Sequence, residues 1–169
     1  EDLLILGSAS GQLFVVDPEN LIELQSFAVS TSPIVDIDEG ENGLVLAMDS
    51  DGRIFSLFIN DKGELESMMI TRCDVDQARF TSIEILDNDK FALGTSGSGI
   101  YINNMHSSGC APINDRKPDA GQASGLTVHA LYHKKSDNLL YIASDQGIYI
   151  YDSDGELEIV SEKSTRLPS

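Results

Sequence analysis

Four glycines recur along the chain at nearly constant intervals, each within a similar local pattern. Gly11, Gly52, Gly99 and Gly147 are 41, 47 and 48 residues apart. Each glycine ends a short polar turn that follows an apolar run, and an aromatic residue comes soon after it. This order is typical of two strands joined by a tight turn, because glycine tolerates the positive φ that such turns require. The repeat therefore predicts four similar β units.

Each unit contains more than this hairpin. Strand-like runs precede three of the copies, namely "PIVDID", "RFTSIEIL" and "LTVHALYH", and outer runs such as "IELQSF", "ELESMMI" and "ELEIV" follow the aromatic strands. A period of roughly 40 to 50 residues with four strands per unit is that of β-propeller blades. No long stretch has an apolar period of 3.6 residues. We therefore expect an all-β fold made of four-stranded antiparallel propeller blades.

About four blades fit within the single domain predicted for residues 1–169. The expected divisions are a partial blade over 1–29, blades over 30–72, 73–125 and 126–163, and the start of another blade over 164–169. The third blade contains a long loop, 103–125, rich in Gly, Pro and Ser. An open arc of blades would expose two apolar sheet faces. We therefore expect a larger ring of six to eight blades, completed by missing chain or by a second subunit.

Two stretches resemble known propeller families. "LYIASDQGIYIYDSDGEL" is similar to the blade repeat of two-component-regulator-type propellers, and "FTSIEILDNDKFALGTSGSGIYI" resembles the degenerate WD40-like blades of eukaryotic scaffold and vesicle-tethering proteins. The resemblance covers essentially the whole chain. It implies a rigid platform that binds a protein or peptide.

Charge restricts the partners. The chain has 28 acidic and 11 basic residues, for a net charge of −17, which repels nucleic-acid phosphates and anionic lipid. We therefore expect no nucleic acid and no membrane as partner, and a protein partner with basic character. Cys73 and Cys110 form no CxxC pair and are too few for a disulfide framework. With no N-x-S/T sequon, they favour an intracellular, reducing setting such as the cytoplasm.

Two groups of residues could in principle bind a metal ion, but their patterns fit hairpin turns and packing better. "DSDG" occurs at 49–52 and 152–155 and offers two carboxylates and a glycine, as calcium loops do, but the Glu twelve residues from the first Asp is missing. His129 and His133 share a face of a strand but are about 13 Å apart at ~3.3 Å per residue, too far for one ion. We expect hairpin turns and packing residues here, and no metal.

Candidate catalytic groups are equally isolated. Cys110 and His106 could form a nucleophile and base, but no third orienting group is evident in loop 103–125. "GTSGSG" precedes a strand rather than a helix, so it lacks the helix N-terminus that binds phosphate. Asp36, Asp38 and Glu84 lie on innermost strands without forming a repeated set. The sequence predicts neither a catalytic residue nor a cofactor.

The turns between the second and third strands of the blades should project from one rim. These turns are "SASG", "DSDG", "SGSG" and "SDQG", and the predicted partner-binding residues there are Asp49, Asp51, Arg53, Asp145 and Gln146. Loops held by rigid blades commonly carry binding function. The sequence thus predicts a non-catalytic interaction scaffold. The alternatives are a ligand-binding or sensor propeller, such as the extracytoplasmic domain of a signalling protein, and a propeller enzyme.

Overall fold

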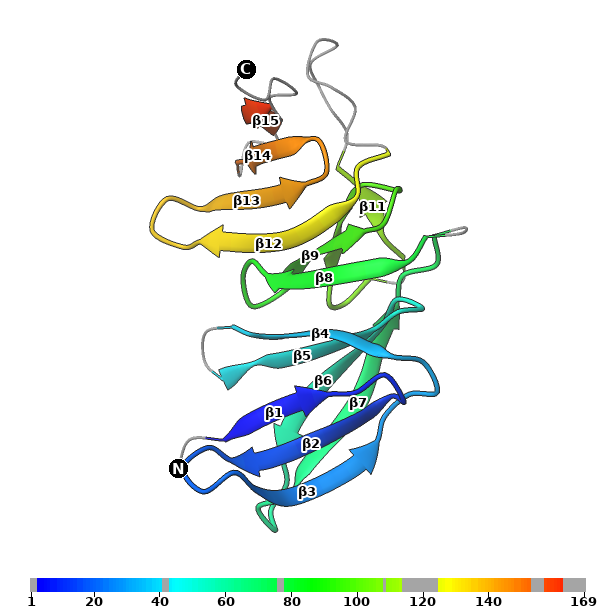
Figure 1. Cartoon of the computed structure of the whole chain (residues 1–169), viewed down its shortest axis with the longest axis vertical. Helices are drawn as coiled ribbons and strands as arrows, with labels where there is room; N and C mark the ends of the chain where they lie inside the picture. Colours follow the sequence, from blue (N-terminus) through cyan, green and yellow to red (C-terminus); the bar gives the residue numbers. More distant parts are fainter. Residues whose placement is uncertain are drawn as a thin grey trace, which may run out of the picture.

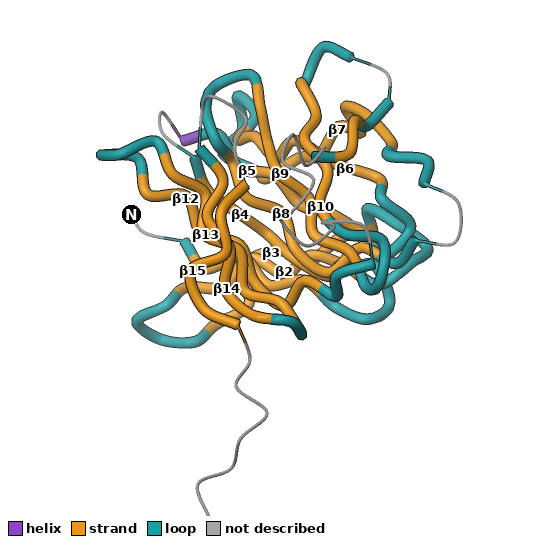
Figure 2. The backbone as a smooth tube through the Cα atoms, turned by 90° about the horizontal axis from the view of Figure 1, so that it is seen from above, coloured by secondary structure: helices purple, strands orange, loops and turns teal. Residues whose placement is uncertain are grey.

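Four antiparallel sheets follow one another along the chain in the computed structural model (Figure 1). The structure describes residues 3–40, 43–75, 78–107, 109–113, 125–152 and 157–162. Figure 2 shows that strands make up most of this backbone and that the loops lie at its edge. No helix in the described part of the chain is long and apolar enough to cross a membrane. The expected all-β architecture is confirmed.

The first two sheets occupy the N-terminal half of the chain. The first consists of β1 (Leu4–Gly7), β2 (Gln12–Asp17) and β3 (Ile22–Ala28), in that spatial order. The second consists of β4 (Ile34–Glu39), β5 (Val45–Asp49), β6 (Arg53–Ile59) and β7 (Leu65–Arg72). The first sheet therefore has three strands and starts at the strand that comes second in the other sheets.

The last two sheets repeat the four-stranded pattern. One consists of β8 (Phe80–Ile85), β9 (Lys90–Thr95), β10 (Ile100–Asn104) and the two-residue β11 (Ala111–Pro112). The other consists of β12 (Val128–Lys134), β13 (Leu139–Ser144), β14 (Gly147–Tyr151) and β15 (Leu157–Glu162). The outer strand of the third sheet is thus reduced to two residues, which lie within the Gly, Pro and Ser-rich segment 103–125.

The sheets stack face to face, and their apolar residues fill the spaces between them. Three hydrophobic clusters lie between successive sheets, and each contains buried residues from both neighbours. The innermost strands β4, β8 and β12 lie next to one another. Figure 1 shows sheet β1–β3 and sheet β12–β15 at opposite ends of the stack. The described sheets therefore form an open series of about four propeller blades.

Two blades have glycine where they pack closely against the next blade. A Cβ on Gly7 would lie 2.5 Å from Ile34 Cγ2, and a Cβ on Gly94 would lie 2.6 Å from Val128 Cγ1. Both glycines are followed by the rim turn of their blade, and both lie against the first residue of the next innermost strand. A larger side chain at Gly7 or Gly94 would push the next blade away, whereas the second blade buries Met48 at the corresponding position.

A disulfide joins Cys73 and Cys110, whose Cα atoms are 5.4 Å apart. It connects the segment after β7 to the segment before β11, and Cys73 is buried in the cluster between the second and third sheets. Two cysteines are too few for a disulfide framework, and the sequence did not predict this bond, which joins residues 37 positions apart.

Candidate binding surface

The rim turns share one structural device. The residue that opens each turn carries a side-chain oxygen, and that oxygen accepts a hydrogen bond from a backbone N–H later in the turn. The four residues are Ser8, Asp49, Thr95 and Ser144. Such side-chain to backbone bonds fix tight turns. Each turn therefore keeps its shape without a metal.

A backbone hydrogen bond also ties each turn to the start of its own innermost strand. The N–H groups of Ser50, Ser96 and Asp145 donate to carbonyls at 2.9, 2.8 and 3.0 Å respectively. The accepting carbonyls belong to Pro33, Arg79 and Thr127. The rim is thus held by the same contact in the second, third and fourth blades.

Asp49 is fully buried beneath the second turn, at 0% exposure. Its Oδ1 accepts the N–H groups of Asp51 and Arg53, both at 2.9 Å. Its Oδ2 accepts the Ser30 hydroxyl at 2.6 Å and the Arg53 guanidinium at 3.0 Å. A buried carboxylate with four donors is fully compensated. Asp49 therefore supports the rim from within rather than facing a partner.

The other predicted rim residues differ in position and exposure. Asp51 accepts from Ser32 at 2.7 Å and from Arg53 at 3.2 Å, and 46% of its side chain is exposed. The structure thus brings Asp49, Asp51 and Arg53 into one cluster. Asp145 and Gln146 lie apart from that cluster, on the fourth sheet, and both are exposed. The part of the second "DSDG" copy at 153–155 lies outside the described residues.

Ser30 and Ser32 belong to this cluster but were not predicted. Both come from the segment between β3 and β4, and they bind Asp49 and Asp51 across 19 positions of sequence. The stretch "STSP" directly before an innermost strand was the available signal. The sequence does not indicate that these serines bind Asp49 and Asp51, because the two segments come together only in the folded blade.

Acidic side chains on the innermost strands join neighbouring blades. Asp36 Oδ2 and Asp38 Oδ2 accept the N–H groups of Ile83 and Ile85 at 2.9 and 2.7 Å. Glu84 Oε1 accepts the His133 N–H at 2.7 Å. Innermost strands have unpaired N–H groups along one edge. These carboxylates satisfy such groups on the next blade.

Two of these carboxylates occupy the same repeat position. Asp38 pairs with Leu46 across its sheet, and Glu84 pairs with the corresponding Ala92. Sequence reasoning did not align Asp36, Asp38 and Glu84 into a catalytic set, and the observed contacts give the three a bracing role instead. Tyr132 takes the equivalent place in the fourth blade, opposite Tyr141.

The environment of Glu84 favours its neutral form. Partial burial raises the pKa of Glu84 from its ordinary 4.5 to about 7, opposed by the hydrogen bond from His133 and assisted by the charges of Asp38 and Asp36. Burial likewise raises the pKa of Asp36 above its ordinary range. Both groups line an open groove along the innermost strands.

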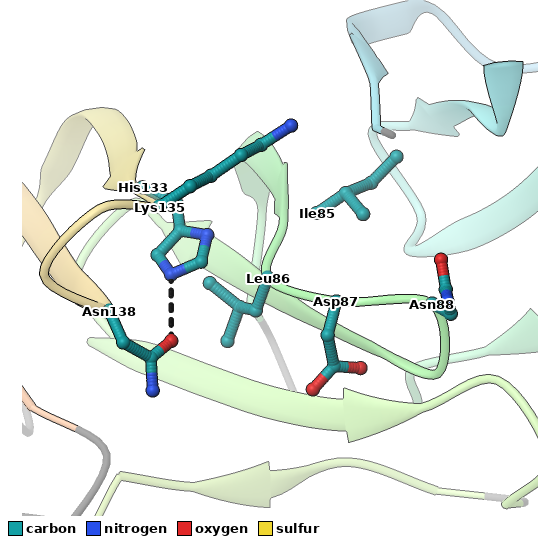
Figure 3. Close-up of a pocket in the computed structure, with 7 residues that line it drawn as sticks. All are labelled: Ile85, Leu86, Asp87, Asn88, His133, Lys135 and Asn138. Atoms are coloured by element: carbon teal, nitrogen blue, oxygen red, sulfur yellow. Dashed lines mark hydrogen bonds between the residues drawn. The ribbon is translucent and has the colours of Figure 1, made fainter. Parts of the chain in front are cut away.

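A pocket of about 260 Å³ lies on the opposite rim, between the hairpins of the third and fourth blades (Figure 3). His133 and Asn138 enter it from one side, and Asp87 and Leu86 from the other. His133 Nε2 lies 3.1 Å from Asn138 Oδ1, and its buried Nδ1 has no hydrogen-bond partner. Two apolar residues, Ile85 and Leu86, line this pocket together with five polar ones, Asp87, Asn88, His133, Lys135 and Asn138.

The remaining chemical candidates are separated by the structure. Cys110 is bonded to Cys73, and His106 Nε2 lies 3.3 Å from Asp89 Oδ1, so the two side chains that were considered as a nucleophile and base have other partners. His129 is exposed whereas His133 is buried. A bulge between Val128 and Ala130 interrupts the alternation that should have placed both histidines on one face. Among the described residues, no group of three or more potential ligands could hold a metal.

Comparisons with known proteins identify the fold. No protein-family model matches the chain. No curated protein matches it either. The structure is similar to the β-propeller domain of Cps50 (Swd1) from Myceliophteria thermophila, with a TM-score of 0.71 and 14% identity over 95% of this chain.

The alignment covers 54% of that domain, so the chain spans about half its length. The computationally designed Ika4 protein is also similar, with a TM-score of 0.60 and 18% identity over 90% of this chain and 86% of that one. The chain therefore has a β-propeller fold, of which it forms about four blades.

Proposed function

We propose that the protein is a non-catalytic scaffold whose rim turns bind a protein or peptide with basic character. The observation that carries this proposal is that hydrogen bonds within each rim turn hold its backbone in place. Asp49 and the corresponding hydroxyl residues hold each turn from within, which leaves Asp51, Asp145 and Gln146 exposed on a preformed surface. Binding to preorganised groups loses little conformational entropy.

The net charge of −17 supports a basic partner. Electrostatic complementarity raises the rate of association and selects partners. Propeller domains commonly serve as interaction platforms, and the likeness to the Cps50 (Swd1) domain is consistent with this use.

The experiment is a selection of displayed peptides on the purified protein, followed by fluorescence anisotropy with the selected sequences. The double variant Asp51→Lys and Asp145→Lys should weaken binding of the selected basic peptides about tenfold or more. The matched control is Asp61→Lys, in an exposed turn between β6 and β7. Equal affinity for all three proteins would contradict the rim as binding surface.

A further inference from the structure

One ring nitrogen of His133 lacks a partner within the described part of the chain. The residue is only 6% exposed, and its backbone N–H donates to Glu84 Oε1 at 2.7 Å. Its Nε2 lies 3.1 Å from Asn138 Oδ1, whereas no described residue bonds to the buried Nδ1. Most buried polar atoms in folded proteins are paired, because an unpaired one costs free energy. Nδ1 therefore marks a place where a further group can bind.

The bond to Asn138 determines what kind of group this is. An amide oxygen only accepts, so the neutral imidazole donates from Nε2 and keeps a lone pair on Nδ1. Asn138 ends the hairpin between β12 and β13 with a φ of 54°, in the left-handed region that asparagine tolerates. The bonds to Glu84 and Asn138 hold the ring in place. Nδ1 is thus a fixed acceptor that requires a ligand with a hydrogen-bond donor.

His133 lines the pocket between the third and fourth blades, and Figure 3 shows its second ring nitrogen on the side of Ile85 and Leu86. This pocket of about 260 Å³ adjoins another of about 250 Å³, which shares Leu86 and His133 with it. The second pocket adds Ile102 and Tyr151, and both pack against the apolar cluster between the third and fourth sheets. The single acceptor therefore lies among apolar walls that suit a ring.

The charges around the two pockets select among donors. Lys90 and Lys135 line them, together with Asp87, whose Oδ2 lies 3.9 Å from Lys90 Nζ. Two cations beside one carboxylate disfavour an ammonium or guanidinium ligand, because like charges in one site repel each other. The ligand should therefore carry a neutral donor.

We infer that this pocket binds the side chain of a tyrosine from a protein or peptide partner, with its hydroxyl donating to His133 Nδ1. Tyrosine is the smaller of the two aromatic side chains with a neutral donor, and such donors usually find a partner when buried. A volume of about 260 Å³ is below the ~300–1,000 Å³ of pockets for drug-sized ligands, so it suits one side chain of a larger molecule. Tyrosines that fill pockets often dominate binding.

This site goes beyond the function proposed for the rim turns. It lies on the opposite rim and takes a neutral ring rather than a basic group. Either site could therefore fail in experiment without the other.

The test compares two ligands that differ only by the hydroxyl. N-acetyl-tyrosinamide and N-acetyl-phenylalaninamide are titrated into the protein with isotope-labelled histidine, and proton–nitrogen correlation spectra report on each ring nitrogen. In the free protein, His133 should carry a proton on Nε2 and none on Nδ1. The tyrosine derivative should shift the Nδ1 resonance and bind about tenfold more tightly than the phenylalanine derivative.

Variants of the two histidines of β12 locate the site. His133→Gln retains a polar group near Asn138 but lacks the Nδ1 acceptor, so it should bind both derivatives equally weakly. His129→Gln, at an exposed position of the same strand, is the matched control and should keep the preference for tyrosine. The double variant Asp51→Lys and Asp145→Lys should also keep it, because those residues belong to the other rim.

Several results would overturn the inference. They are a proton on Nδ1 in the free protein, no binding or equal binding of the two derivatives, tighter binding of N-acetyl-tryptophanamide, and a preference for tyrosine that survives His133→Gln. If His133→Gln does not fold, the comparison of the ligands on the wild-type protein decides.

Discussion

Asp49 and Asp51 belong to one turn, yet their carboxylates lie in different environments. Asp49 is buried with donors on both oxygens, whereas the Asp51 carboxylate is half exposed. The sequence predicted this turn from its glycine but placed both aspartates on the surface, as is usual for turn residues. Burial of Asp49 depends on Ser30 and Arg53, which reach it only in the folded blade.

Replacing Asp49 should therefore cost much more stability than replacing its neighbour. Asp49→Ala leaves the Arg53 guanidinium and two backbone N–H groups without their acceptor, and we expect a loss of about 2–4 kcal/mol in the free energy of unfolding. Asp51→Ala should cost less than about 1 kcal/mol, as is typical of exposed ion pairs. Urea denaturation measures both values. Similar losses for the two variants would contradict the buried network.

Glu84 should make stability depend on pH. Its folded-state pKa is about 7 against an ordinary 4.5, so the folded protein keeps a proton that the unfolded chain loses between these values. The contribution of Glu84 to stability therefore falls as the pH rises from about 4.5 to 7, and stays lowered above that range.

The variant Glu84→Gln remains neutral and retains the oxygen that accepts the His133 N–H. The melting temperature of this variant, relative to that of the wild type, should increase as the pH rises from about 4.5 to 7. Glu19→Gln, in an exposed turn, controls for the general loss of one negative charge. A constant difference between Glu84→Gln and the wild type from pH 4.5 to 8 would refute the raised pKa.

At the scale of the strand and hairpin, local chemistry predicted most of the structure. The turn glycines, the apolar runs and the polar hairpin turns predicted the four strands of the second blade. Contacts between elements were not predictable from the same patterns. The sequence places Asp38 and Glu84 on innermost strands, but it does not indicate which N–H groups they bind. Those N–H groups belong to the neighbouring sheet, and they come within reach only when the sheets pack together. The bulge beside His129 likewise has no clear local signal.

The disulfide is the clearest such contact between elements, and its removal should destabilise the second and third blades. Closure of a loop between residues 37 positions apart contributes about 2–4 kcal/mol to the free energy of unfolding. The double variant Cys73→Ala and Cys110→Ala should show this loss in urea denaturation. Wild-type protein in reductant should unfold at the same urea concentration as the double variant, whereas the double variant should not respond to reductant. A wild-type midpoint that reductant leaves unchanged would contradict the bond.

At the scale of the whole molecule, the repeat explains the stacking of the sheets. Each described interface between successive sheets buries apolar residues from both of them. The sequence predicted this stacking from the period alone. It could not predict which residues fill each interface, because the alternation of strand residues toward the two neighbours depends on the register within each sheet. That register places Leu13, Ile54 and Ile100 at one repeat position, and each lies in the cluster shared with the following sheet.

Peptide binding at the rim tests this account most directly, because the account assigns recognition to the exposed groups of the rim turns. Fluorescence anisotropy with basic peptides selected on the wild-type protein compares the wild type, the double variant Asp51→Lys and Asp145→Lys, and the control Asp61→Lys. The account predicts about tenfold weaker binding for the double variant alone. Equal affinity of the double variant and the wild type would contradict it.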